Sequence, residues 1–112
     1  MHARITTYDS GYPEDYDAGL AALRAEIAPQ IQALPGYRGS VSLLDRATGR
    51  SLSITFWEDA DAVAATRATA EQIRERAAAT SGSRVVEVVE YEVCLTDVPL
   101  PRAAGPDTSP PT

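Results

Sequence analysis

The segment 50–63, Arg-Ser-Leu-Ser-Ile-Thr-Phe-Trp-Glu-Asp-Ala-Asp-Ala-Val, predicts a strand that leads directly into a helix. Alternate side chains of this strand fall on two faces, one with Leu52, Ile54 and Phe56 and the other with Ser53, Thr55 and Trp57. Neither face is charged, which favours a strand that is covered on both sides. Asp59 and Asp61 suit the cap and first turn of the helix, where negative charge is favourable.

The helix after this strand carries a thin apolar stripe at spacings of three and four residues, formed by Val63, Thr66, Ala70, Ile73 and Ala77. Small residues on the stripe let the helix lie close to a sheet or leave space for a ligand. Gly82 is placed to end the helix. The valine-rich run 85–95 predicts a final strand, with Val85, Val89 and Tyr91 on one face.

Upstream of the opening segment, residues 37–46 predict a strand that is joined to it by a short loop ending in Gly49, as in a β-hairpin. Before the hairpin, an amphipathic helix is indicated by the stripe Tyr16, Leu20, Leu23, Ile27, Ile31 and Leu34. Pro29 lies inside this stripe and is expected to kink or shorten the helix. Residues 3–8 alternate and predict the first strand.

The predicted order is therefore β-α-β-β-α-β, an α+β ferredoxin-like domain with a four-stranded antiparallel sheet and both helices on one face. We expect this domain to span residues 1–96 and the proline-rich segment 97–112 to be a disordered tail. The open sheet face is expected to be apolar, which predicts a homodimer that buries sheet against sheet as a dimeric α+β barrel. A monomer with a polar open face is the alternative.

Composition and charge argue against several classes of function. The 112 residues suffice for one domain. A net charge of −6 without a basic stripe argues against nucleic acid, and no apolar run reaches the ~20 residues of a membrane span. The single Cys94 is expected to be a buried structural thiol, and the absence of a leader-like start favours the cytoplasm. All ten basic residues are arginine, which suggests a bacterial source.

Two stretches resemble a known family. The corner Leu-Pro-Gly-Tyr-Arg-Gly at 34–39 and the strand-to-helix step at 51–62 resemble the antibiotic biosynthesis monooxygenase-like group of the dimeric α+β-barrel superfamily. The resemblance covers residues 1 to about 96. It implies the same fold, a homodimer and a small-molecule ligand.

The resemblance also implies site residues. In the cofactor-free monooxygenases of this group a tryptophan lines the substrate pocket, with an asparagine four residues before it and a tyrosine six residues after it. This chain has Trp57 in the first position, Ser53 in the second and Val63 in the third. Trp57 and Ser53 are therefore the catalytic candidates, and Val63 is a substrate-binding candidate. Tyr16 is a second substrate-binding candidate because it lies on the apolar stripe of the first helix. A core tryptophan with no ligand role is the alternative interpretation of Trp57.

The function implied is a cofactor-independent monooxygenase acting on a small aromatic or apolar molecule. The alternative is a non-catalytic ligand-binding or stress-response dimer on the same fold. The haem-degrading branch binds iron through a histidine of the second helix, and this helix has none; the only histidine is His2. No metal or cofactor is expected.

Overall fold

The computed structural model describes residues 1–9 and 16–97. In chain order its elements are β1 (His2–Asp9), α1 (Tyr16–Ala22), the π-helical turn η2 (Leu23–Ile27), α2 (Ala28–Gln32), β2 (Tyr37–Asp45), β3 (Arg50–Trp57), α3 (Ala60–Ser81) and β4 (Arg84–Glu92). The proline-rich segment beyond Asp97 lies outside the described residues.

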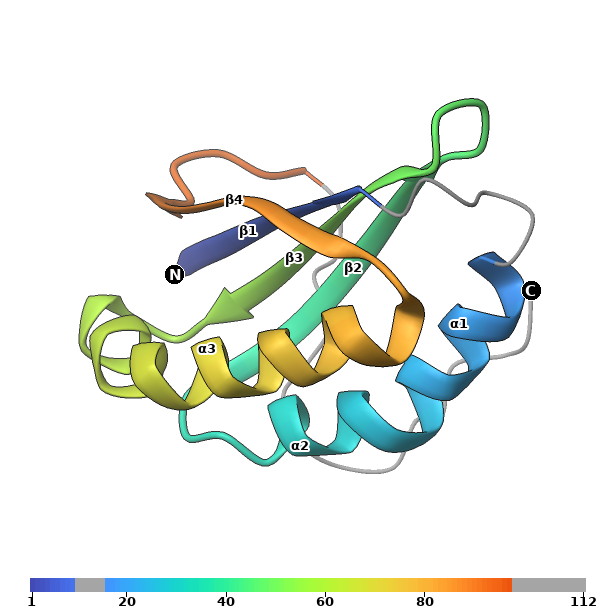
Figure 1. Cartoon of the computed structure of the whole chain (residues 1–112). Coiled ribbons are helices and arrows are strands. Elements are labelled where there is room, and N and C mark those ends of the chain that lie inside the picture. Colours follow the sequence, from blue (N-terminus) through green and yellow to red (C-terminus); the bar gives the residue numbers. More distant parts are fainter. Residues whose placement is uncertain (10–15, 98–112) are drawn as a thin grey trace.

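The four strands form one antiparallel sheet in the order β2-β3-β1-β4, and the helices lie on one side of it (Figure 1). This confirms the predicted ferredoxin-like α+β fold. The hairpin β2-β3 and the pairing of β1 between β3 and β4 follow from the predicted element order. Among the described helices, none has the length and apolar character needed to cross a membrane.

Helix α3 begins and ends where its sequence predicts. The side chain of Asp59 accepts a hydrogen bond from the backbone N–H of Ala62 at 2.8 Å. Gly82 ends the helix with φ 69°, a left-handed conformation that glycine adopts without steric cost. The buried residues of the helix are the predicted stripe: Val63, Thr66, Ala70, Ile73 and Ala77.

The first helical segment changes form just before Pro29, where the sequence predicts a kink or a shortened helix. Helix runs without a break from residue 16 to residue 32, and the turn before the proline widens into η2. The π turn brings Pro29 into the first turn of α2, where a missing N–H costs nothing. Gln30 donates a side-chain hydrogen bond to the carbonyl oxygen of Glu26 at 2.8 Å, so this carbonyl is also satisfied.

The last strand is shorter than expected and carries a bulge. It ends at Glu92 rather than residue 95, and its register shifts between Thr7 and Tyr8 of the neighbouring strand. Val85 therefore pairs with Tyr8 and shares its face, whereas Val89 pairs with Ile5 on the other face. The prediction that Val85 and Val89 share one face is wrong because the bulge inserts one extra residue.

The prediction of a buried thiol is also wrong, since Cys94 lies beyond the end of β4 and is exposed. The core lies between the sheet and the helices. Two buried clusters form it, one of Ile27, Ile73 and Ala77 and the other of Tyr37, Trp57 and Val63.

Candidate functional site

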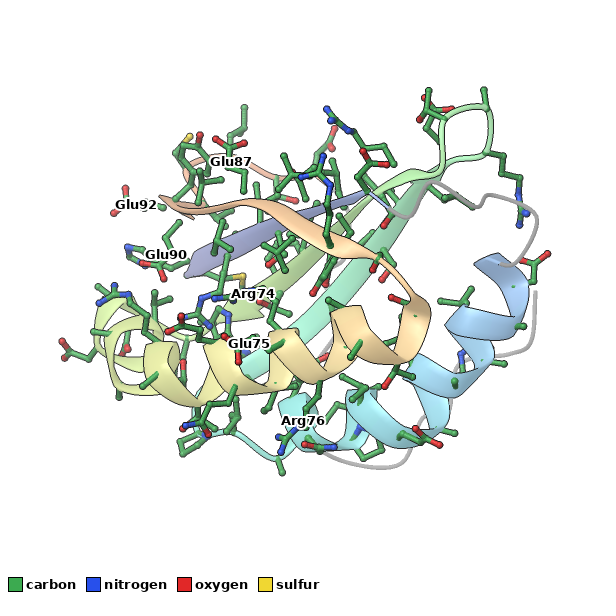
Figure 2. The ribbon with its side chains drawn as sticks, in the orientation of Figure 1. Arg74, Glu75, Arg76, Glu87, Glu90 and Glu92 are labelled. Atoms are coloured by element: carbon green, nitrogen blue, oxygen red, sulfur yellow. The ribbon has the colours of Figure 1, made fainter. Side chains whose placement is uncertain are left out.

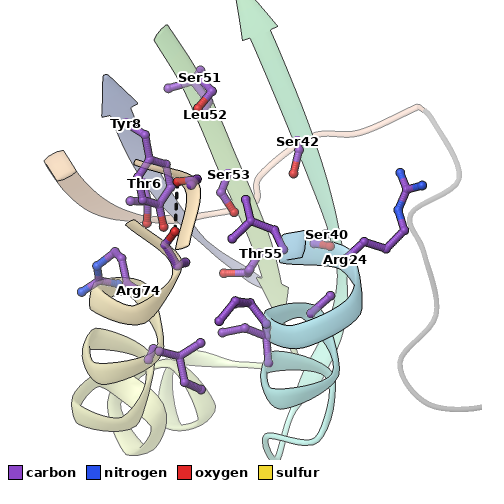
Figure 3. A pocket seen from close by; sticks show the side chains of 18 of the residues that line it. Thr6, Tyr8, Arg24, Ser40, Ser42, Ser51, Leu52, Ser53, Thr55 and Arg74 are labelled. Atoms are coloured by element: carbon purple, nitrogen blue, oxygen red, sulfur yellow. Dashed lines mark hydrogen bonds between the residues drawn. The ribbon is translucent and has the colours of Figure 1, made fainter. Parts of the chain in front are cut away.

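A cavity of about 570 Å³ lies between the sheet and the helices. The helical side is mostly apolar and includes Leu20, Leu23, Ile27, Ile31 and Ile73. The sheet side carries hydroxyl groups, among them Thr6, Tyr8, Ser40, Ser42, Ser53 and Thr55. Figure 3 shows these groups on neighbouring strands, on the side of the sheet where the helices lie. The cavity thus has one apolar wall and one wall of hydrogen-bonding groups.

The hydroxyl wall follows from strand alternation and register. Ser53 pairs with Thr6 on one side and with Ser42 on the other, so the three hydroxyls form a row across the sheet. The apolar residues between them, such as Ile54, point to the opposite face. A sheet face packed against helices is usually apolar. Burying these hydroxyls without hydrogen-bond partners would cost free energy, so they favour a polar ligand or water in the cavity.

Trp57 closes one end of the cavity and is fully buried, with 0% exposure. Its indole N–H donates to the hydroxyl of Thr55 at 2.9 Å. The ring of Tyr37 meets it edge to face, with the ring centres 5.9 Å apart. Val63 packs against the same pair of rings. Trp57 is therefore a rigid wall whose polar atom is already satisfied.

Arg4 is the buried cation of the site, with 3% exposure. Its Nη2 donates to the carbonyl oxygen of Val63 at 2.8 Å, and its Nε donates to Glu90 at 3.2 Å. Its Nη1 is buried and has no hydrogen-bond partner among the described residues. Burial lowers the pKa of Arg4, although hydrogen bonding to Glu90 opposes that change.

Glu90 connects Arg4 to the surface of α3. It also accepts two hydrogen bonds from the exposed Arg67, at 2.7 and 3.1 Å. The hydrogen bonds from Arg67 are the main reason why the pKa of Glu90 lies below its ordinary value. Figure 2 shows Glu90 on the α3 side of β4 and Glu87 on the other side, as strand alternation predicts.

Tyr8 lies farther along β1 from Trp57 than Arg4 does, and Arg74 comes from α3 where this helix passes over the strand (Figure 3). Burial raises the pKa of Tyr8 to about 12, and the positive charge of Arg74 opposes this rise. The phenol is therefore protonated at neutral pH and can donate a hydrogen bond. Arg74 makes no ion pair with an acidic residue in the described part of the chain.

The four predicted site residues fall in different places. Trp57 and Ser53 both line the cavity. Ser53 has no hydrogen-bond partner among the described residues, so its hydroxyl is available to a ligand. Val63 is buried behind Trp57 and is not among the described residues that line the cavity. Tyr16 begins α1, but its side chain lies outside the described part of the structure.

The sequence reasoning missed Arg4, Thr6 and Arg74. Arg4, Thr6 and Tyr8 are every second residue of β1 and therefore share one face of the strand. This alternation was visible in the sequence. Arg74 lies four residues after Ala70 and three before Ala77, so helical spacing places it beside the buried stripe of α3. In the described part of the chain no group of three or more His, Cys, Asp or Glu side chains is arranged to hold a metal ion.

No protein-family model matches the chain. Over 93 residues, 83% of its length, the chain is 34% identical to the uncharacterized protein Rv2557 of Mycobacterium tuberculosis. That stretch is 41% of the relative, so the chain spans about two fifths of the length of this curated relative. This similarity assigns no activity.

Solved structures show the fold. A protein of Deinococcus radiodurans assigned as an antibiotic biosynthesis monooxygenase matches with a TM-score of 0.62 and 17% identity, over 89% of this chain and 99% of that one. The monooxygenase ActVA-Orf6 of Streptomyces coelicolor, solved with nanaomycin D, matches with a TM-score of 0.63 and 15% identity, over 88% of this chain and 91% of that one. SnoaB of Streptomyces nogalater, a cofactor-independent oxygenase, matches with a TM-score of 0.55 and 22% identity, over 85% of this chain and 94% of that one. The chain therefore shares the ferredoxin-like α+β fold of these proteins, as the sequence predicted.

Proposed function

We propose that this chain, which has the fold of the antibiotic biosynthesis monooxygenases, is a cofactor-independent oxygenase of a small aromatic molecule. The observation that carries the proposal is the cavity of about 570 Å³ with a hydroxyl wall, an apolar wall and Trp57 at one end. Its volume lies within the range of roughly 300–1,000 Å³ that is typical of small-molecule sites. The activity given in the names of ActVA-Orf6 and SnoaB agrees with this proposal.

The proposed reaction converts an activated methylene group and one molecule of oxygen into a ketone and one molecule of water. The substrate loses a proton, and its stabilised anion passes one electron to oxygen. The resulting pair combines into a peroxide, which takes up the proton and then loses water. The protein's part is to exclude water and hold the anion. Trp57 is the aromatic wall against which the substrate ring lies, and Ser53 donates a hydrogen bond to the substrate oxygen.

Two further residues complete the proposed substrate site. Tyr16 precedes Leu20 and Leu23 on the same helical stripe, and both of these line the cavity. This spacing supports Tyr16 as a substrate contact from the helical side. Val63 packs against Trp57, so its proposed contribution to binding is to set the position of that ring.

Oxygen uptake tests the proposal. The full chain, free of added metal and flavin, is mixed with 1,8-dihydroxyanthrone in an oxygen electrode, and the product is identified by mass spectrometry. We expect saturable uptake of one molecule of oxygen per anthrone. Ser53→Ala should lower kcat/KM by about tenfold, which matches the loss of one hydrogen bond to a charged group. Thr69→Ala, on the exposed side of α3, is the control and should change nothing. A rate equal to that of the free anthrone contradicts the proposal.

A second candidate function is ligand binding without chemistry. Ser53 and Val63 stand where the monooxygenase pattern has asparagine and tyrosine, and the described residues that line the cavity include no carboxylate or imidazole. Quenching of the Trp57 emission by the anthrone without any oxygen uptake would favour this function.

A further inference from the structure

The charge of the cavity is opposite to the charge of the chain. The chain carries a net charge of −6. The charged side chains among the described lining residues are nevertheless all arginines, Arg4, Arg24 and Arg74. Arg24 is exposed, whereas Arg4 is buried and Arg74 half-buried. An acidic protein that gathers cations and no carboxylate around one cavity is suited to a negatively charged ligand.

Arg4 is held so that one donor remains unused. Its Nη2 and Nε are fixed by Val63 and Glu90, at 2.8 and 3.2 Å. Its Nη1 has no partner among the described residues, although the side chain is only 3% exposed and borders the cavity. Buried donors are almost always satisfied, because leaving one unpaired is costly. A ligand oxygen at this end of the cavity would supply the missing acceptor.

Arg74 brings a second positive charge to the same region. It lies close enough to both Arg4 and Tyr8 for its charge to lower the pKa of each. Glu90 offsets Arg4, but Glu90 is also shared with Arg67. Two guanidinium groups with so little compensation repel each other, and an anion between them would remove that repulsion. The protonated Tyr8 adds a donor, and Thr6 lies between Arg4 and Tyr8 on β1.

We propose that the ligand of this cavity is an aromatic anion whose charged oxygen lies between Arg4 and Arg74, over Thr6. This inference rests on the proposed function and deepens it by naming the charge of the substrate. The described lining residues include no base to take a proton. The substrate therefore gives its proton to bulk water before it enters the cavity, and the two arginines favour the ionised form once it is bound.

A matched pair of probes tests this inference. The dyes 8-anilinonaphthalene-1-sulfonate and N-phenyl-1-naphthylamine share their rings and differ in the anionic sulfonate. Binding of each is followed by quenching of Trp57, the single tryptophan, which lines the cavity. We expect the sulfonate to bind about tenfold to a hundredfold more tightly, the effect of charged hydrogen bonds.

Arg74→Gln should remove most of that preference and leave the affinity of the neutral dye unchanged. Arg74→Lys, which keeps the charge, should retain most of it. Arg76→Gln is the matched control, because Arg76 lies on the other side of the same helix and bonds to Gln30 (Figure 2). Arg4→Gln should act like Arg74→Gln; if it does not fold, Arg74→Gln decides.

Equal affinities of the unmodified protein for the two dyes would overturn the inference, and so would an Arg74→Gln variant that keeps the full preference. The dyes are not oxidised in this assay, so its result is independent of oxygen uptake. A preference for the sulfonate without anthrone oxidation would sustain the anion site and reject the oxygenase. Anthrone oxidation with equal dye affinities would do the reverse.

Discussion

The guanidinium carbon of Arg4 lies 5.2 Å from the centre of the Trp57 ring. A cation over an indole face is attracted by the ring electrons, by roughly 0.5–2 kcal/mol. The contact joins the cation of the site to its aromatic wall. Since Glu90 and the carbonyl oxygen of Val63 also hold the guanidinium by hydrogen bonds, this part of the cavity is fixed from β1, β3, β4 and α3 together.

Trp57→Ala should lower the free energy of unfolding by about 3–5 kcal/mol, the usual cost of emptying a buried aromatic site. The side chain has 0% exposure and packs against Tyr37 and Val63, so the space cannot be filled by a small rotation of one neighbour. Urea denaturation followed by circular dichroism measures the change. Thr69→Ala, at an exposed position of α3, is the control and should stay within about 0.5 kcal/mol. A loss below about 1 kcal/mol in Trp57→Ala would mean that this wall is dispensable.

The ion pairs of Glu90 predict a dependence of stability on pH. The folded-state pKa of Glu90 lies below its ordinary value, mainly because Arg67 donates hydrogen bonds to it. The stabilisation is therefore complete above the pKa of the unfolded chain, about 4.3, and is lost as the pH falls through the lower folded pKa. Glu90→Gln should destabilise the protein by more than about 1 kcal/mol at pH 7: the pair with the exposed Arg67 is screened and contributes little, but the substitution also leaves the buried Arg4 without its carboxylate.

Urea titrations at pH 7 and pH 3 check this prediction. The difference in stability between the unmodified protein and Glu90→Gln should be smaller at pH 3 than at pH 7, because protonation of Glu90 as the pH falls removes the charge that the variant lacks. The control is Glu75→Gln, because Glu75 is exposed on α3 and makes no ion pair among the described residues. A difference that is the same at both pH values would assign the effect to packing instead of charge.

The sequence was sufficient for the elements whose patterns are local. The stripe of α3 predicted all of its buried residues, because apolar spacing on a covered helix reports burial directly. The two faces of β3 also followed from alternation. A disturbance of the first helix at Pro29 was predicted, but its form, a π turn, depends on packing that the sequence does not show. The bulge at the start of β4 has no local signal in a valine-rich run.

The site was less predictable than the fold. Trp57 and Ser53 came from resemblance, whereas Arg4 and Arg74 were overlooked. An arginine on a strand or a helix is usually solvated, so burial of Arg4 depends on Glu90, 86 residues away in sequence. The cavity depends on the distance between the helices and the sheet, and no local sequence pattern predicts that distance.

Gly36 at the corner before β2 should tolerate no side chain. A Cβ atom there would lie 2.4 Å from the Cβ of Ala62, and the backbone has φ +83°. Gly36→Ala should therefore destabilise the protein by more than the roughly 1–2 kcal/mol expected from a left-handed conformation alone. Gly82→Ala is the matched control, since its φ is +69° but nothing lies within 4 Å of the added atom.

Thermal unfolding of the two glycine variants separates the loss of stability due to the close Cβ contact from the loss due to the left-handed backbone conformation. Adding Ala62→Gly to Gly36→Ala should recover part of the loss, because it removes the atom that collides. If Gly36→Ala and Gly82→Ala lose the same stability, the contact between Gly36 and Ala62 is not limiting.

The open face of the sheet predicts a homodimer. Large apolar side chains remain exposed on it, with 37% for Val41, 48% for Leu43 and 59% for Tyr91. Ile5 and Ile54 lie on the same face by register. The helices cover only the other side of the sheet (Figure 1), so nothing in the described chain shields these residues. A patch of this kind is costly in water and is best covered by a second copy of itself.

Sedimentation equilibrium should therefore give twice the mass of the chain for the unmodified protein. Leu43→Asp places a charge within the exposed apolar patch and should weaken the dimer by tenfold or more, about 1.4 kcal/mol. The matched control is Ala68→Asp, which adds the same charge on the exposed side of α3 and should leave the mass unchanged. A monomeric unmodified protein, or equal masses for both variants, would reject the sheet-to-sheet dimer. Because the proposed cavity lies on the helical side of the sheet, a monomeric Leu43→Asp variant should still bind the anionic dye through Arg4 and Arg74.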